Sequence, residues 1–314
     1  MAGRKEVINY KEGSVFDEFK SVFQKPNNAH VQLIVINVAV FLVMGAIYVF
    51  STVGGADWVY AFISKQFTIP PKFGDFLLRP WTIFTYAFAH SLTDIFHILF
   101  NMLIFYWFGR IFIEYLGNDK LIALYVLGAI TGGVVYLMVY NLVPYFMERS
   151  DFLGMVGASA AVFAIVTGAA VLLPDYTFHL LFLGPIKIKY IAAFYIIMSF
   201  LGSVGSNAGG NIAHLGGALI GFVYIKQLQV GVDWGSWVTS TLDWIKGWFD
   251  PRPKVKVTYR KSEPKEKAKS FTKAKAGSKA SQEEIDAILD KISERGYESL
   301  SSDEKEKLFN ASKK

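Results

Sequence analysis

The segment that decides the fold is GASAAVFAIVTGAAVLLP, residues Gly157–Pro174. It lies in a longer stretch, from Phe152 to Pro174, that contains no Asp, Glu, Lys or Arg. Proline ends a helix because it lacks the N–H group that the helix needs, so an apolar helix is expected over residues 157–173. A charge-free stretch of this length is typical of a helix that crosses a membrane.

The composition extends this interpretation to most of the chain. Of its 314 residues 53% are hydrophobic and only 18% are charged, whereas a soluble domain carries about 25% charged residues. Further charge-free stretches cover Val31–Ala56, Leu121–Met147 and Tyr190–Ile225. A soluble enzyme and a disordered regulator are therefore excluded. The absence of cysteine excludes disulfides, thiolate metal sites and a cysteine nucleophile.

These stretches predict an all-α fold, a polytopic membrane protein with a bundle of six transmembrane helices and a short soluble helical tail. The expected spans are residues 31–53, 95–113, 121–142, 157–173, 188–201 and 211–225. Glycines divide the last two spans, because glycine at this density marks a turn. Aromatic residues crowd the long loop before the second span, which predicts a loop partly embedded in the membrane interface.

Four parts are expected along the chain: an N-terminal segment 1–30, a membrane domain 31–227, an interfacial segment followed by a basic disordered linker 228–280, and a helical tail 281–314. Four tryptophans between Asp233 and Phe249 indicate the interfacial segment. The tail has apolar residues at helical spacing, namely Ile285, Ile288, Leu289 and Ile292.

The charge distribution predicts orientation and partners. The net charge is +6, and 18 of the 32 Lys and Arg residues lie from Lys246 onward. A basic tail beside a membrane favours contact with anionic lipids, whereas no motif accompanies the charge that would indicate nucleic acid. Lys and Arg in the short loops predict cytoplasmic N- and C-termini, and the expected location is a bacterial cytoplasmic (inner) membrane. The oligomeric state is not predicted.

Two polar residues stand at the starts of the fourth and sixth expected spans. Ser159 is either a helix cap or a nucleophile beside the free N–H groups of a helix N-terminus. His214 is either a packing residue bonded to a backbone carbonyl or a proton relay. Both spans enter from the same side and both residues lie at the same depth, so a Ser–His pair is geometrically feasible.

His97 and Asn101 are four residues apart and therefore share one face of the second span. They are either donors to an oxyanion or hydrogen-bonding groups that fasten the bundle. A zinc site made by His90, His97 and His214 is not favoured, because no carboxylate falls at ligand spacing, and no metal or cofactor is predicted. A proton path through His97 and His214 in a transporter is also disfavoured, because no buried carboxylate and no inverted repeat are found.

Together these residues resemble the rhomboid family of intramembrane serine proteases, over about Val31–Ile225. HILFN (His97–Asn101) is similar to the family's His-xxx-Asn pattern, GASA (Gly157–Ala160) to Gly-x-Ser, and AHLGG (Ala213–Gly217) to the Ala-His segment. The motif RPW (Arg79–Trp81) and His90 in the first loop also fit. The helical tail resembles an appendage of some bacterial members.

The resemblance implies a serine endopeptidase that hydrolyses peptide bonds in or near transmembrane helices of other proteins. Ser159 would be the nucleophile and His214 the general base of a dyad. His97, Asn101 and the backbone N–H of Ser159 would form the oxyanion hole. The alternative is a non-catalytic rhomboid-like protein that binds transmembrane helices.

Two positions depart from the family pattern. Ala160 stands where glycine often follows the serine, and Phe163 stands where many members have tyrosine. Alanine is still small, and a phenyl ring can still pack against His214. Neither departure removes the dyad, so an inactive enzyme is not inferred.

Overall fold

The computed structural model describes residues 21, 23–148, 154–180, 184–249, 282–295 and 299–311. The chain forms two compact units, Met1–Pro253 and Lys254–Lys314, and each is described by itself. Most of the expected N-terminal segment and the expected basic linker over 251–280 lie outside the described residues.

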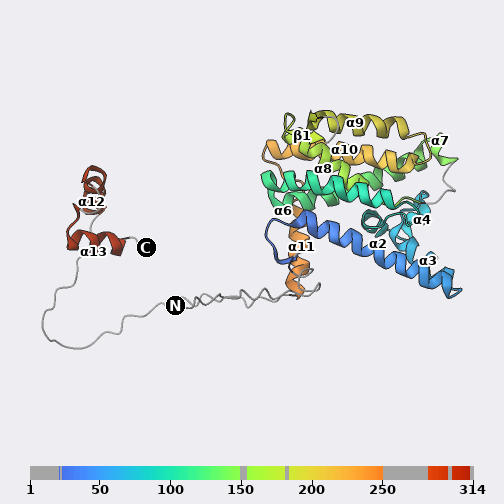
Figure 1. The fold of residues 1–314 in the computed structure, drawn as a ribbon, viewed down its shortest axis with the longest axis horizontal. Helices are drawn as coiled ribbons and strands as arrows, with labels where there is room; N and C mark the ends of the chain where they lie inside the picture. Colours follow the sequence, from blue (N-terminus) through green and yellow to red (C-terminus); the bar gives the residue numbers. More distant parts are fainter. Residues whose placement is uncertain are drawn as a thin grey trace, which may run out of the picture. The chain divides into compact units, whose positions relative to one another are not determined.

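The first unit is a helical bundle with one small hairpin. Its elements are α2 (Ala29–Val53), α3 (Asp57–Ser64), η1 (Lys65–Phe67), α4 (Phe73–Leu77), α5 (Thr82–Thr85), η2 (Tyr86–Phe88), α6 (Ile95–Leu142), α7 (Pro144–Met147), α8 (Ser159–Leu172), β1 (Thr177–Leu180), β2 (Gly184–Lys187), α9 (Ile188–Gly202), α10 (Ala208–Gln229) and α11 (Ser236–Phe249). The long apolar helices run side by side, and α11 runs across them (Figure 1).

Helix α6 turns back on itself at Gly117, whose φ of 80° and ψ of 176° are not helical. The rings of Phe105 and Tyr125 lie 5.5 Å apart, although 20 residues of straight helix would separate them by about 30 Å. The two halves of α6 are therefore antiparallel neighbours. They correspond to the second and third expected spans, and glycine suits the turn because it adopts positive φ without a steric penalty.

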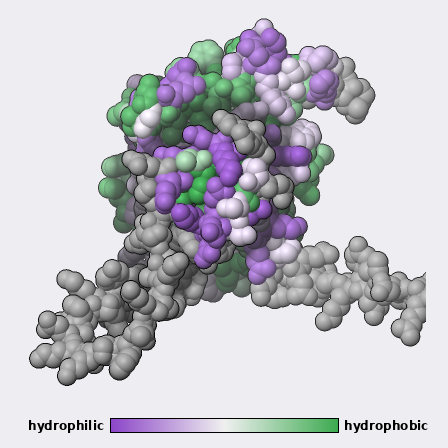
Figure 2. Space-filling model, turned by 90° about the vertical axis from the view of Figure 1, so that its left-hand side faces the viewer, coloured by the Kyte–Doolittle hydropathy of each residue, from purple (hydrophilic) through white to green (hydrophobic). Residues whose placement is uncertain are grey.

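The described residues contain three helices that are long and apolar enough to cross a membrane, α2, α6 and α10, while α8 and α9 are shorter apolar helices. The chain is therefore a membrane protein. The number of crossings stays a prediction. Large hydrophobic side chains stand exposed on the bundle, including Leu42, Phe50, Phe194, Phe200 and Leu219. Figure 2 shows such apolar surface in green along the edges of the view, as contact with lipid chains requires.

Helices α8 and α10 meet along a seam of small residues. A Cβ atom added to Gly217 would lie 2.0 Å from the carbonyl oxygen of Ala160, and one added to Gly221 would lie 2.3 Å from that of Ala164. The two backbones therefore touch, which only glycine allows at these positions. The seam brings the start of α8 next to the middle of α10, one turn beyond His214.

The loop before α6 fixes the segment that leads into α8. Ile69 and Met155 form an isolated antiparallel bridge, and Gly157 donates its N–H to the carbonyl of Tyr86 over 2.9 Å. Tyr86 is fully buried and donates its hydroxyl to the carbonyl of Ala129. The backbone just before Ser159 is thus held by two parts of the loop.

The prediction that all regular elements are helices is wrong at one place. The strands β1 and β2 pair as an antiparallel hairpin between α8 and α9. Asp175 precedes the hairpin and forms ion pairs with Lys187 and Lys189, both at 2.9 Å. The hydrogen bonds that these two lysines donate lower the pKa of Asp175 to about 2. Each strand has only four residues and β2 contains Pro185, so the sequence carries too short a pattern to indicate the hairpin.

The segment after α10 forms the helix α11, which is anchored at its start. Asp233 accepts a hydrogen bond from Tyr224 and pairs with Lys120 at the turn of α6. Burial alone would raise the pKa of Asp233, but the hydrogen bonds from Lys120, the Gly235 N–H and Tyr224 lower it. Three tryptophans of α11 stand exposed, Trp237, Trp244 and Trp248.

The second unit contains α12 (Gln282–Arg295) and α13 (Ser302–Ala311). Ile288 of α12 and Leu300, which precedes α13, are buried. Lys291 pairs with Glu304 at 2.9 Å, and its hydrogen bond lowers the pKa of Glu304 to about 2, with further help from Ser301. The expected amphipathic tail helix therefore packs against a second short helix.

Candidate active site

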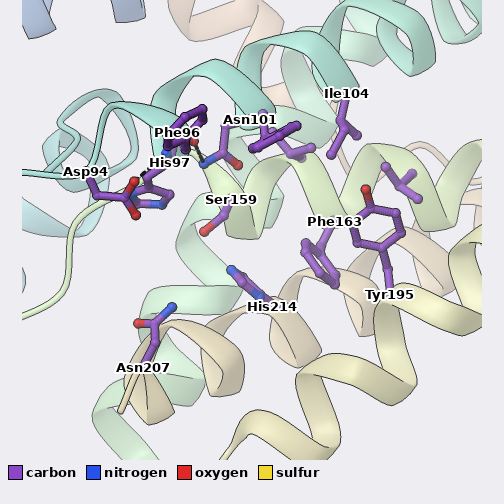
Figure 3. Close-up of a pocket in the computed structure, with 13 residues that line it drawn as sticks. Asp94, Phe96, His97, Asn101, Ile104, Ser159, Phe163, Tyr195, Asn207 and His214 are labelled. Carbon is purple, nitrogen blue, oxygen red and sulfur yellow. Dashed lines mark hydrogen bonds between the residues drawn. The ribbon is translucent and has the colours of Figure 1, made fainter. Parts of the chain in front are cut away.

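A cavity of about 280 Å³ lies where α6, α8, α9 and α10 meet. All four polar residues singled out in the sequence line it: His97, Asn101, Ser159 and His214. Figure 3 shows Ser159 pointing toward His214, with His97 and Asn101 on the other side of the serine. Apolar side chains make up much of the remaining wall.

Ser159 is the first residue of α8, and its side chain does not cap the helix. The capping position belongs to Ala158, and no side chain bonds to the free N–H groups there. The first hydrogen bond into the helix runs from Val162 N–H to the Ala158 carbonyl. The N–H of Ser159 therefore has no partner within the helix, which leaves it available to a developing negative charge.

His214 is held from two directions. Its ring stacks on that of Phe163, with centroids 4.2 Å apart and planes 12° from parallel. Its Nδ1 atom lies 3.1 Å from the hydroxyl of Ser199 on α9. Nε2 is the ring nitrogen left for Ser159. No hydrogen bond joins these two side chains in the described part of the chain, and such contacts commonly tighten only when substrate binds.

His97 and Ser159 face a gap that Gly157 keeps open. A Cβ atom on Gly157 would lie 3.0 Å from His97 Nε2 and 3.5 Å from Ser159 Oγ, and its φ of 133° is unfavourable for any other residue. Asp94 caps the start of α6 by accepting the N–H of His97. Asn101 donates one amide hydrogen to the His97 carbonyl over 2.7 Å, and its second amide hydrogen remains for a ligand.

Comparison with protein families identifies this unit. The family model described as Rhomboid domain matches residues 78–229, which include all four residues and the seam. The chain belongs to the rhomboid family. It is also similar to RHOMBOID-like protein 12, mitochondrial, of Arabidopsis thaliana, with 32% identity over 164 residues, 49% of this chain and 48% of the relative. The chain thus matches about half the length of that curated relative. Residues 274–314 match a family of unknown function, DUF6576.

Two non-catalytic interpretations that the sequence left open do not fit the contacts of this domain. Ser159 is not a cap, and Nδ1 of His214 lies at a side-chain hydroxyl rather than at a backbone carbonyl. The packing expected of Phe163 against His214 is confirmed by their ring stack. In the described residues, no three His, Asp or Glu side chains lie close enough together to hold a metal ion.

Sequence reasoning missed several side chains of this rhomboid site. Ser199, Tyr195 and Asn207 lie on or beside α9 and α10, and Tyr195 and Asn207 line the cavity. Ser199 had one signal: it is a polar residue in the middle of an apolar span, which calls for a partner. Asp94 had another, because aspartate three residues before His97 is a typical helix cap.

Proposed function

We propose that this rhomboid protein is an intramembrane serine endopeptidase that cleaves peptide bonds in or near transmembrane helices of other membrane proteins. The observation that carries the proposal is the cavity lined jointly by Ser159 and His214 from two helices whose backbones touch. A hydroxyl and an imidazole from different chain segments, beside free N–H groups, form the constellation used in acyl transfer.

In the proposed reaction, Ser159 Oγ attacks the carbonyl carbon of the substrate while His214 Nε2 takes the hydroxyl proton. The carbonyl oxygen becomes negatively charged, and the Ser159 N–H, His97 and Asn101 donate hydrogen bonds to it. The C–N bond then breaks as His214 passes its proton to the leaving amine. Water attacks the acyl-enzyme, His214 accepts the water's proton and returns it to Oγ, and the new carboxyl end leaves.

The membrane setting and the partners are part of this proposal. Substrates are transmembrane proteins whose helix unwinds locally in the cavity, because a helical peptide bond is shielded from attack. The loop charges support an orientation with both chain ends in the cytoplasm. Contact with membrane lipids is supported by the exposed tryptophans of α11, which runs across the bundle (Figure 1) as an interfacial helix would.

The test is cleavage of a model transmembrane substrate by the purified protein in detergent. Wild type is expected to cleave, while Ser159→Ala and His214→Ala are expected to lose cleavage, with unfolding temperatures close to wild type. Ser203→Ala removes a hydroxyl just after α9 that donates, within the described residues, a hydrogen bond to the Phe200 carbonyl, and it should cleave normally. Equal cleavage by Ser159→Ala would contradict the protease and leave helix binding as the function.

A further inference from the structure

Ser199 is a buried polar residue on a helix whose large apolar side chains are mostly exposed. Only Ile188, Ala192 and Ser199 of α9 are buried, and Ser199 is 3% exposed. Its neighbours Met198 and Phe200 are 51% and 66% exposed. A buried hydroxyl in an apolar helix needs a partner, and the partner here is Nδ1 of His214 at 3.1 Å.

The direction of this hydrogen bond decides what His214 can do. If the hydroxyl accepts, the ring proton resides on Nδ1 and Nε2 carries a lone pair that can take a proton from Ser159. If the hydroxyl donates, the proton of the neutral ring resides on Nε2, and that nitrogen cannot act as a base. The two arrangements therefore predict opposite consequences of removing the hydroxyl.

We propose that Ser199 is a positioning residue whose hydroxyl accepts a hydrogen bond from the Nδ1–H of His214 and thereby directs the Nε2 lone pair at Ser159. This inference rests on the proposed protease function. The stack on Phe163 fixes the plane of the imidazole, and the Ser199 contact fixes its rotation within that plane. Together they leave one ring orientation.

A neutral hydroxyl takes the position here that a carboxylate takes in a Ser-His-Asp triad. The titratable groups that share the cavity with His214 are Asp94 and His97 from α6 and Tyr195 from α9. The only hydrogen-bond partner of Nδ1 in the described residues is Ser199. A hydroxyl orients the ring without adding negative charge, so its removal should cost far less than removal of a triad carboxylate.

The experiment measures kcat and KM of the full-length protein on a transmembrane substrate across pH. Ser199→Ala should lower kcat about tenfold, the effect of one neutral hydrogen bond, with KM unchanged. The acidic limb of its pH profile should move to lower pH, because the imidazolium loses an acceptor. Ser199→Thr retains the hydroxyl and should restore most of the activity, and Ser203→Ala, at the residue that follows α9, should match wild type.

A kcat of Ser199→Ala equal to or above wild type at every pH would overturn the inference. If wild type cleaves and Ser159→Ala does not, an unchanged kcat of Ser199→Ala removes only the proposed role of Ser199. The proposed protease function then still holds. If Ser159→Ala cleaves as well as wild type, the proposed function itself fails.

A measurement on the unmodified side chain covers the case in which Ser199→Ala does not fold. The chain has 5 histidines, so nitrogen NMR of protein labelled in histidine gives few signals, and His214→Gln assigns the one of interest. At neutral pH the proton should reside on Nδ1. A proton on Nε2 would overturn the inference.

Discussion

The α8–α10 seam and helix α9 border the same cavity but are attached to the protein in opposite ways. All residues of α8 from Ala160 to Ala170 are buried, and its backbone touches that of α10. Helix α9 buries three residues and exposes most of its large apolar side chains. The comparison teaches that Ser159 and His214, the proposed nucleophile and base, are carried by a close-packed unit, while α9 contributes through a few inward side chains.

The largest effect is expected from adding one methyl group to the seam. In Gly217→Ala the new Cβ would overlap the Ala160 carbonyl oxygen, so α8 and α10 must separate. Overpacking of this kind should reduce the free energy of unfolding by about 3 kcal/mol or more, measured by thermal unfolding in detergent. Gly247→Ala in α11 meets no atom within 4 Å and should keep the unfolding temperature. Equal stability of both variants would contradict a close-packed seam.

A second large effect is expected at Gly157, which precedes α8 and lies beside the cavity. Gly157→Ala would place a methyl group between His97 and Ser159, in the proposed position of the oxyanion. Cleavage should fall about 100-fold, as when an oxyanion donor is lost. Gly231→Ala carries a similar backbone penalty, with φ of 83°, but has open space around it. If both variants lose cleavage equally, backbone strain rather than the cavity is responsible.

An intermediate effect is expected at Phe163, whose ring lies in the α8–α10 unit and also contacts α9. Phe163 stacks on His214 and touches Tyr195 of α9 edge to face at 5.7 Å. Phe163→Leu should lower kcat about fivefold through loss of the stack. Phe163→Tyr keeps the ring and should stay near wild type. A drop in KM alone, with kcat unchanged, would contradict a role in holding the imidazole.

The smallest effect is expected on the outer face of α9. Ile197 is 56% exposed, so Ile197→Ala should change the free energy of unfolding by no more than about 0.5 kcal/mol and leave cleavage unchanged. A loss as large as that of Gly217→Ala would mean that α9 is packed like the seam, and the comparison would fail.

The sequence predicted the features that depend on local pattern. Charge-free stretches located the apolar helices, because hydrocarbon excludes unpaired charge over a whole segment. The motifs HILFN, GASA and AHLGG identified the family that the rhomboid match confirms. The roles given to Ser159, His214, His97 and Asn101 stay predictions until activity is measured.

The sequence could not predict contacts between distant segments. Ser199 and His214 meet through the packing of α9 against α10, and Ile69 pairs with Met155, which lies 86 positions further along the chain. Neither contact leaves a periodic pattern in the residues. The β1–β2 hairpin was not predicted because its strands are four residues long and one contains Pro185.

The most direct test of the central claim is the reaction of Ser159 with a fluorophosphonate probe, located by mass spectrometry. The account predicts a phosphonyl group on Ser159 Oγ, formed with loss of fluoride, and little or no labelling in His214→Ala. Labelling of Ser159 at the same rate without His214, or no labelling of Ser159 in folded wild type, would contradict the account.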